Sequence, residues 1–478
     1  MDAEAHRGFR ALVAGGRPVG EVIAVNNFLV EITGLQPVNV HSLILFDDGS
    51  KGFVHRVLED RVIAMHLGAK PVRVGTLASV QHAELLAKVG KDFIGRVVSV
   101  TGQPLDGKGA IAPDDAWRVF NHAPPIYERE RLTTQMETGV TALDALFPLV
   151  RGQRLAIIGE GKSGKTTLAT QIAINQRTTD QIVVYVMVAK RRSDIDTLLS
   201  RLSDNGAMDK SIVVVSTIFE SLALSYLAPY VGCAMAEYIW QKLGQDTLIV
   251  YDDLAAHAHA YREISLLSGT SPGRDSYPGD IFYAHSSLLE RAGRLKVNHR
   301  CLTALPLVTA DSGDITAYLP TNVMSITDGQ WILDMEIFRE GVRPALNLGN
   351  SVTRVGTRGY NERQSRQNAA ALRAVAAYNQ AKQFAHFGTS LSAAARNDVA
   401  KGEHLRQLFT QAPGETYDLL TQQLMLDVVL EADAMANLDV SLLKRQAKLL
   451  SSRIKVDNEY EPTKQQLKEQ VFVQKAVA

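Results

Sequence analysis

Residues 159–166 read Gly-Glu-Gly-Lys-Ser-Gly-Lys-Thr and match the phosphate-binding pattern GxxxxGK[ST]. An apolar run at residues 155–158 precedes the motif, and Leu168 and Ile172 form one apolar face in the segment that follows it. Glycines let such a loop turn tightly, so that successive backbone N–H groups and the start of a helix point at phosphate oxygens. The stretch therefore predicts a strand, a P-loop and a helix within an α/β domain.

Two residues of the P-loop are expected to act most directly on the ligand. Lys165 would reach the β and γ phosphates, and the Thr166 hydroxyl would ligate Mg²⁺. We therefore expect ATP or ADP, together with Mg²⁺, as the cofactors of this site. The predicted nucleotide-binding residues of this segment are Gly159, Glu160, Gly161, Lys162, Ser163, Gly164, Lys165, Thr166 and Thr167.

A second strand with a carboxylate at its end completes the predicted nucleotide site. The apolar run at residues 248–251 leads into Asp252 and Asp253. Ligands of open α/β sheets bind at the carboxyl ends of the strands, so Asp252 is the candidate for holding Mg²⁺ through water. Alone, such a pair is more often a helix cap or a turn. The P-loop shifts the balance towards the metal site.

The pattern changes towards the amino terminus, where short apolar runs follow one another closely. Turn residues such as those at 47–50 and Gly68 separate them. This spacing predicts a small closed β-barrel. Its expected strands are residues 22–25, 28–32, 43–46, 52–57, 62–65 and 72–74.

From about residue 84 to residue 360, apolar runs alternate with segments of helical periodicity, which is typical of an α/β domain with a mainly parallel sheet. After Asn361 the strand-like runs stop. Leu420, Leu424 and Val428 then recur at helical spacing beside a polar row that includes Gln423, which predicts an amphipathic helix in an all-helical domain. The tail 456–478 is expected to be a solvated helix or a loose end. Expected strands of the α/β domain are residues 155–158, 183–188, 212–215, 248–251 and 302–305.

Composition excludes several classes of protein. The 478 residues carry 51 Lys and Arg against 51 Asp and Glu, so the basic footprint of a nucleic-acid binder is missing and no nucleic-acid partner is expected. The two cysteines lie outside any CxxC spacing, which argues against a disulfide scaffold or a zinc site. The longest apolar run, residues 182–189, is too short for a membrane span, and no targeting sequence is recognisable at the amino terminus.

Several stretches resemble the rotary ATPase family, and within it the alpha-type subunits of F-type ATP synthases. Thr138-Gly139, Ala142-Leu143-Asp144 and Arg151-Gly152-Gln153-Arg154 lead into the P-loop in the family's order. The resemblance covers about residue 19 to about residue 450. Further similar stretches are residues 227–238, 272–280, 288–291, 318–330, 341–345 and 351–356.

The resemblance implies an amino-terminal β-barrel, a central α/β RecA-like P-loop domain and a carboxyl-terminal all-α bundle. We place the tail at residues 1–18, the barrel at 19–83, the RecA-like domain at 84–365 and the helical domain at 366–478. It also implies a ring of three alpha and three beta subunits, in which the beta type carries most hydrolytic sites. The implied partners are a catalytic beta-type subunit, a central-stalk gamma-type subunit and, less securely, a delta-type stator subunit. Only a short segment precedes Val19, whereas the family has a longer docking helix there.

Lys190 decides which role the resemblance assigns to this chain. Catalytic subunits carry a Glu after the strand beside the P-loop strand, where it readies the attacking water. Aligning Lys190-Arg191-Arg192-Ser193 with the alpha pattern Gln-Lys-Arg-Ser puts Lys190 at that position. A cation cannot accept a proton from water at neutral pH, so the chain is expected to bind Mg-ATP and to hydrolyse it poorly alone. Asp253 is a weaker candidate for orienting water.

Arg354 matches the position from which an alpha subunit extends an arginine finger into the neighbouring catalytic site. A guanidinium is planar and always charged, so it can neutralise the phosphoryl group in the transition state. For the adenine base, the resemblance implies Arg343, Pro344 and Gln411. Residues 412–415 do not reproduce the family's second glutamine, and Gly161-Lys162 replace an Arg-Gln pair.

The predicted function is that of a non-catalytic nucleotide-binding subunit of an ATP synthase driven by protons or sodium ions, peripheral to the cytoplasmic face of a bacterial inner membrane. A homohexameric ATPase of the secretion or flagellar type is the first alternative, and it would need a carboxylate at Lys190. The second is an RNA translocase resembling the Rho helicase, which few aromatics in the barrel disfavour. A regulatory subunit of a vacuolar-type ATPase is disfavoured by the intact P-loop.

Overall fold

The computed structural model describes residues 3–386, 392–432 and 438–472. Contacts within the chain divide it into two compact units. The chain passes between the units several times, so neither unit is one continuous stretch of sequence. The first unit comprises Met1–Glu130, Asp180–Thr309 and Ile315–Thr327, and the second comprises Arg131–Thr179, Ala310–Asp314 and Asp328–Ala478.

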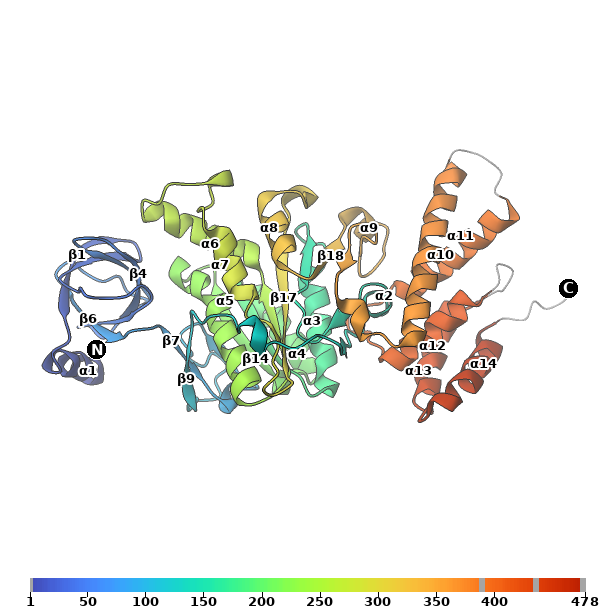
Figure 1. Cartoon of the computed structure of the whole chain (residues 1–478), viewed down its shortest axis with the longest axis horizontal. Helices are drawn as coiled ribbons and strands as arrows, with labels where there is room; N and C mark the ends of the chain where they lie inside the picture. The colour runs from blue at the N-terminus through green and yellow to red at the C-terminus, as the bar shows by residue number, and fades with distance from the viewer. Residues whose placement is uncertain (1–2, 387–391, 433–437, 473–478) are drawn as a thin grey trace. The chain divides into compact units, whose positions relative to one another are not determined.

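The first unit begins with a closed antiparallel barrel of strand order β1-β2-β5-β4-β3-β6 (Figure 1). Side chains that face inwards, among them Val30, Ile32, Ile44 and Phe46, are fully buried and form its core. The barrel is confirmed, as are all but one of its predicted strands. A helix, α1 (Ala3–Ala14), precedes it. The strands are β1 (Val19–Asn26), β2 (Leu29–Thr33), β3 (Leu43–Phe46), β4 (Lys51–Val57), β5 (Val62–His66) and β6 (Leu77–His82).

The predicted strand at residues 72–74 is wrong, because the strand that closes the barrel is β6. β6 pairs with both β1 and β3. Val72 is buried, but Val74 is 65% exposed and Gly75 has a left-handed φ of 89° that turns the chain. The segment Val72-Arg73-Val74 is therefore a loop, since closure of the barrel depends on pairing with two distant strands.

A parallel sheet of order β17-β15-β13-β14-β8 forms the centre of the first unit. The strands are buried along nearly their whole length, as in sheets covered by helices on both faces. Four predicted strands are confirmed here, and the short β8 was missed. Bounds are β8 (Val97–Ser99), β13 (Ile182–Lys190), β14 (Ser211–Thr217), β15 (Thr247–Asp252) and β17 (Cys301–Thr309), with α4 (Arg192–Asp204), α5 (Leu222–Glu237), α6 (Leu254–Leu267), α7 (Ile281–Leu289) and α8 (Tyr318–Ile326), the hairpin β7 (Leu86–Val89) and β9 (Asp115–Arg118), and β16 (Gly293–Arg294).

Two buried histidines join α6 to α7 in this unit. His257 Nδ1 lies 3.1 Å from His285 Nε2, and the His257 ring stacks on Tyr226 at 5.3 Å between centroids. Both imidazoles are fully buried. Burial lowers the pKa of His285 to about 4, and burial together with the neighbouring imidazole lowers the pKa of His257 well below its ordinary value.

The free energy of unfolding is expected to fall as the pH drops from about 6.5 towards 4, by about 3 kcal/mol at pH 4 from His285 alone. The unfolded chain binds a proton at His285 near pH 6.5, whereas the folded chain does so only near pH 4. Stability is therefore complete above pH ~6.5 and is lost on acidification. Urea unfolding at several pH values measures it. His285→Gln should flatten the pH dependence, and the exposed His122→Gln should not; equal slopes for both variants would contradict the prediction.

The second unit holds the P-loop and the helices of the carboxyl-terminal part (Figure 1). β12 pairs in parallel with β18, and β19 adds to β18 in antiparallel orientation. The predicted fold class is thereby confirmed: a barrel, an α/β part that carries the P-loop, and a helical part. Bounds are β10 (Gln135–Met136), α2 (Thr141–Leu146), β11 (Leu149–Val150), β12 (Ala156–Gly159), α3 (Lys165–Asn175), β18 (Gly329–Leu333), α9 (Met335–Arg339), β19 (Val352–Thr353), α10 (Glu362–His386), α11 (Ala393–Phe409), α12 (Leu419–Leu430), α13 (Val440–Ser451) and α14 (Tyr460–Val471).

Helix α12 forms where the sequence predicts it, but it is buried on nearly all sides. In the predicted polar row, Gln423 is 9% exposed, whereas Asp427 is half-buried and Glu431 is exposed, so only part of this row meets solvent. Gln422 donates to Asp144 Oδ2 at 2.8 Å, and Gln423 O accepts from Gln367 at 3.0 Å. Polar residues of α12 therefore form hydrogen bonds to neighbouring helices, here α2 and α10.

The tail is not loose up to Phe472, which corrects the prediction for it. Tyr460, Leu467 and Val471 of α14 are fully buried, and Tyr460 donates to Asp427 Oδ2 at 2.8 Å. α14 packs against α12 and α13. Residues 473–478 lie outside the described residues. Across the described ranges, no helix has both the length and the apolar character that crossing a bilayer requires.

Candidate functional site

The P-loop turns between β12 and α3 at two positions that require glycine. A Cβ on Gly159 would lie 2.7 Å from both Leu333 O and Ser163 Oγ, and Gly164 has a left-handed φ of 101°. Lys162 is also left-handed, with a φ of 67°. The loop thus presents the amino terminus of α3, where free N–H groups and the helix dipole favour an anion.

The side chains of the loop differ in how they are held. Lys165 Nζ donates to the carbonyl oxygens of Gly159 and Glu160 at 2.9 and 2.8 Å, so the ammonium lies over the loop. The Ser163 hydroxyl is buried and has no hydrogen-bond partner among the described residues. Thr166 is exposed at the start of α3. An ammonium above a ring of N–H groups, with a hydroxyl beside it, is suited to a polyphosphate.

Arg343 and Pro344 lie in the same unit as the P-loop, after α9. The Arg343 guanidinium lies over the Phe338 ring at 3.3 Å from its centroid and donates to Phe338 O and Val342 O at 2.5 and 2.8 Å. The sequence reasoning missed Phe338. Phe338 lies five residues beyond β18, in the short helix α9.

Gln411 ties the segments around the P-loop helix together. It is 2% exposed; its Nε2 donates to Gly139 O and Glu415 O at 3.0 and 2.9 Å, and its Oε1 accepts from Thr141 N at 2.6 Å. Its backbone N–H donates to Arg343 O at 2.7 Å. The side-chain amide is engaged by backbone groups, so Gln411 positions Arg343 and the segment after it. Gln171 of α3 also donates to Glu415 O, at 2.7 Å.

Arg354 follows the edge strand β19 and is exposed. Its backbone is anchored: Arg354 N donates to Asp328 O at 2.9 Å, and Asp328 is paired with Arg154 at 2.8 Å. Gly356 approaches so closely that a Cβ there would lie 1.8 Å from Pro148 O. The arginine therefore projects from a rigid edge of its unit.

Asp252 and Lys190, in the first unit, are joined by a short ion pair. Lys190 Nζ lies 2.5 Å from Asp252 Oδ1, and Tyr185 OH donates to Asp252 Oδ2 at 3.0 Å. Asp252 is 1% exposed. Burial by itself lowers the pKa of Lys190, but the carboxylates of Asp252 and Asp253 outweigh it and raise the pKa above its ordinary value. Lys190 is thus a permanent cation beside the predicted metal ligand.

Asp253 is also committed to neighbours within its own unit. Its Oδ1 accepts from Ala256 N at 2.7 Å and caps α6, and its Oδ2 accepts from Thr309 at 3.0 Å. Both carboxylates of the pair therefore have partners on both oxygens. The helix-cap interpretation, which the sequence left open for this pair, applies to Asp253.

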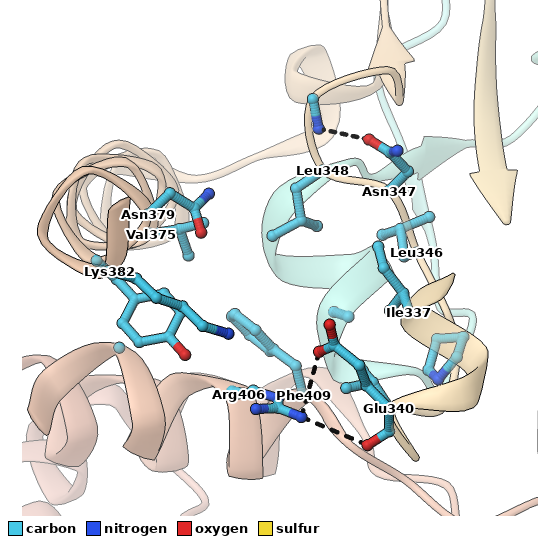
Figure 2. A pocket seen from close by; sticks show the side chains of 16 residues that line it. Ile337, Glu340, Leu346, Asn347, Leu348, Val375, Asn379, Lys382, Arg406 and Phe409 are labelled. Atoms are coloured by element: carbon cyan, nitrogen blue, oxygen red, sulfur yellow. Dashed lines mark hydrogen bonds and ion pairs between the residues drawn. The ribbon is translucent and has the colours of Figure 1, made fainter. Parts of the chain in front are cut away.

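A cavity of about 320 Å³ lies in the second unit (Figure 2). Among the predicted site residues, only Pro344 lines it. Ile337, Leu348 and Phe409 give it apolar walls, and Arg406 crosses its rim to Glu340 at 3.5 Å. The sequence analysis missed this cavity, because α9, α10 and α11 form it from distant segments.

Comparisons with known proteins agree on one family. The chain matches the family described as "ATP synthase alpha/beta family, nucleotide-binding domain" over residues 139–353. It matches "ATP synthase alpha/beta chain, C terminal domain" over residues 363–477. A protein named ATP synthase subunit alpha, from Dehalococcoides mccartyi, is 40% identical over 412 residues, which cover 85% of this chain and 82% of that protein.

Proposed function

The chain belongs to the ATP synthase alpha/beta family, and from this premise we propose that it is a non-catalytic, nucleotide-binding alpha-type subunit. The P-loop and the amino terminus of α3 bind the phosphates of ATP or ADP, with Lys165 balancing their charge. Arg343 and Pro344, held in place by Gln411, flank the base. The negative phosphates of the bound nucleotide stabilise the P-loop. Hydrolysis of the nucleotide is not required of this chain.

One observation carries the non-catalytic assignment: the position of the catalytic carboxylate is taken by a cation. Lys190 lies at the end of β13 and is bonded to Asp252 at 2.5 Å. Each oxygen of Asp252 and Asp253 already accepts one hydrogen bond within the first unit, so the two carboxylates are held in an ion pair and in a helix cap. A protonated lysine cannot accept a proton from water, which supports a non-catalytic role for this chain.

The assembly we propose is a ring in which this chain alternates with a catalytic beta-type subunit around a gamma-type stalk. Arg354, exposed on a rigid edge, would supply a guanidinium to the neighbour's site. The same proposal includes a delta-type stator subunit as a further partner and places the assembly at the periphery of the inner membrane. The two residues predicted to hold Mg²⁺ suit it only in part. The exposed Thr166 hydroxyl is a suitable ligand, whereas both carboxylate oxygens of Asp252 already accept hydrogen bonds.

The purified chain is expected to hold ATP and to turn it over at less than about 1 per second, below the ordinary range for enzymes. Native mass spectrometry of the assembly purified from its own cell should show a second chain type in equal number, with nucleotide on this chain. Lys165→Ala should abolish nucleotide binding, because the ammonium that lies over the carbonyls of Gly159 and Glu160 would no longer balance the phosphate charge. Turnover of several per second by the chain alone, or a ring of this chain only, would refute the proposal.

A further inference from the structure

A second cavity, of about 260 Å³, lies within the first unit, and none of the predicted site residues lines it. One of its walls is the outer face of the barrel, where Leu43 of β3 is the cross-strand partner of Phe53 of β4. These two residues alternate with Ile44 and Val54 of the barrel core, so they lie on the outer face. Leu43 is 7% exposed and Phe53 is fully buried, which means that other parts of the unit cover this side of the barrel.

The remaining walls come from α5, from β7 and from the segment that follows β8. Leu224, Leu227 and Val231 of α5 recur at i, i+3 and i+7 and present an apolar stripe to the cavity. Packed interiors contain few voids larger than a water molecule. Apolar walls with a few placed polar groups are the usual form of a small-molecule site.

Two lysines are the only charged side chains in the lining. Lys51 begins β4, and Lys88 lies in β7 on the same face as Leu86. Within the part of the chain that the structure describes, neither ammonium has a hydrogen bond or an ion pair with a carboxylate. Partial burial and, to a smaller extent, the Lys88 ammonium lower the pKa of Lys51. The two cations repel each other beside an apolar cavity, and a bound anion would relieve this repulsion.

We propose that this cavity binds a medium-chain fatty acid, with its acyl chain among the apolar side chains of α5 and the barrel and its carboxylate between Lys51 and Lys88. The volume corresponds to about eight or nine groups of the size of a water molecule or a methylene, at about 30 Å³ each. The two oxygens of one carboxylate can accept from both ammonium groups, in charge-assisted hydrogen bonds. This site is additional to the proposed nucleotide site and does not depend on it.

Calorimetric titration of the full chain with octanoate, kept below its micelle-forming concentration, tests the proposal. One octanoate should bind per chain. Each methylene removed should weaken binding about fourfold, so butyrate should bind more than about a hundredfold more weakly than octanoate. Octanol keeps the chain length but carries no charge, and it should bind about tenfold more weakly, the usual effect of losing a hydrogen bond to a charged group.

Substitutions in the lining separate the two halves of the ligand. Lys51→Gln and Lys88→Gln should each weaken octanoate about tenfold. They should not lower the urea midpoint of the unliganded chain, because each removes a like-charge repulsion. Leu224→Trp fills the cavity and should abolish binding of octanoate and octanol alike. Lys91→Gln, which removes an exposed lysine outside the lining, is the matched control and should leave the affinity unchanged.

The proposal is overturned if octanoate gives no saturable binding, if butyrate binds as well as octanoate, or if both lysine variants keep the affinity of the natural chain. Vesicles of anionic phospholipid are a further probe. A chain that binds these vesicles but not free octanoate would have a membrane-facing surface instead of a fatty-acid site. All of these outcomes leave the proposed nucleotide binding in place, because the cavity and the P-loop belong to different units.

Discussion

Replacing Arg354 by alanine is expected to lower ATP hydrolysis by the assembled complex about a thousandfold or more, which is the usual contribution of an arginine finger. The guanidinium would neutralise charge that develops on the transferring phosphoryl group in the neighbouring subunit's site, where water is scarce. Because Arg354 is exposed and its backbone is anchored through Asp328, truncation removes the charge without disturbing the edge of the unit. Steady-state ATPase assays on the complex, with assembly checked by native mass spectrometry, measure the effect.

Arg358→Ala is the matched control, because Arg358 is an exposed arginine on the same segment. It should leave turnover within about twofold of the unmodified complex, as is usual for substitutions of exposed residues. Arg354→Lys should recover little activity, since an ammonium lacks the planar fork of donors. Unchanged turnover in Arg354→Ala, or an equal loss in Arg358→Ala, would contradict the finger assignment and leave the nucleotide-binding proposal in place.

Replacing Arg291 by methionine is expected to destabilise the first unit by about 3–5 kcal/mol, as breaking a buried ion pair usually does. Arg291 is 1% exposed, and its Nε and Nη2 donate to the two oxygens of Glu237 at 2.8 and 2.6 Å. Trp117 and Asn121 also donate to Glu237, at 3.0 and 3.1 Å. Without Arg291, the fully buried Glu237 side chain would have lost its cationic partner. Urea unfolding followed by tryptophan fluorescence measures the loss.

The control is Arg118→Met, which removes an exposed pair with Glu84 and should cost less than about 1 kcal/mol. Adding Glu237→Gln to Arg291→Met should restore part of the lost stability, because the amide carries no charge and keeps its shape. If Arg291→Met unfolds at nearly the same urea concentration as the unmodified chain, the pair does not contribute as its burial indicates.

Local pattern was enough for most elements of the fold. Short apolar runs and turn residues predicted the barrel, and the P-loop with its flanking strand and helix predicted the α/β part, because these signals lie within about ten residues of one another. Errors came where an element depends on distant partners. Residues 72–74 form no strand because β6 pairs with β1 and β3, and the tail is a packed helix because α12 and α13 cover Leu467 and Val471.

The sequence by itself determined the P-loop and the order of elements, and through the resemblance it predicted a cation, Lys190, at the position of a catalytic carboxylate. Only the tertiary structure decided what that cation contacts: Lys190 meets Asp252 across 62 residues of chain because β13 and β15 are neighbours in register. In the same way, Gln411 donates to Gly139 across 272 residues, and its backbone N–H donates to Arg343 O. Strand order and helix packing set such pairings, and they arise from the burial of whole faces, which no short stretch of sequence encodes.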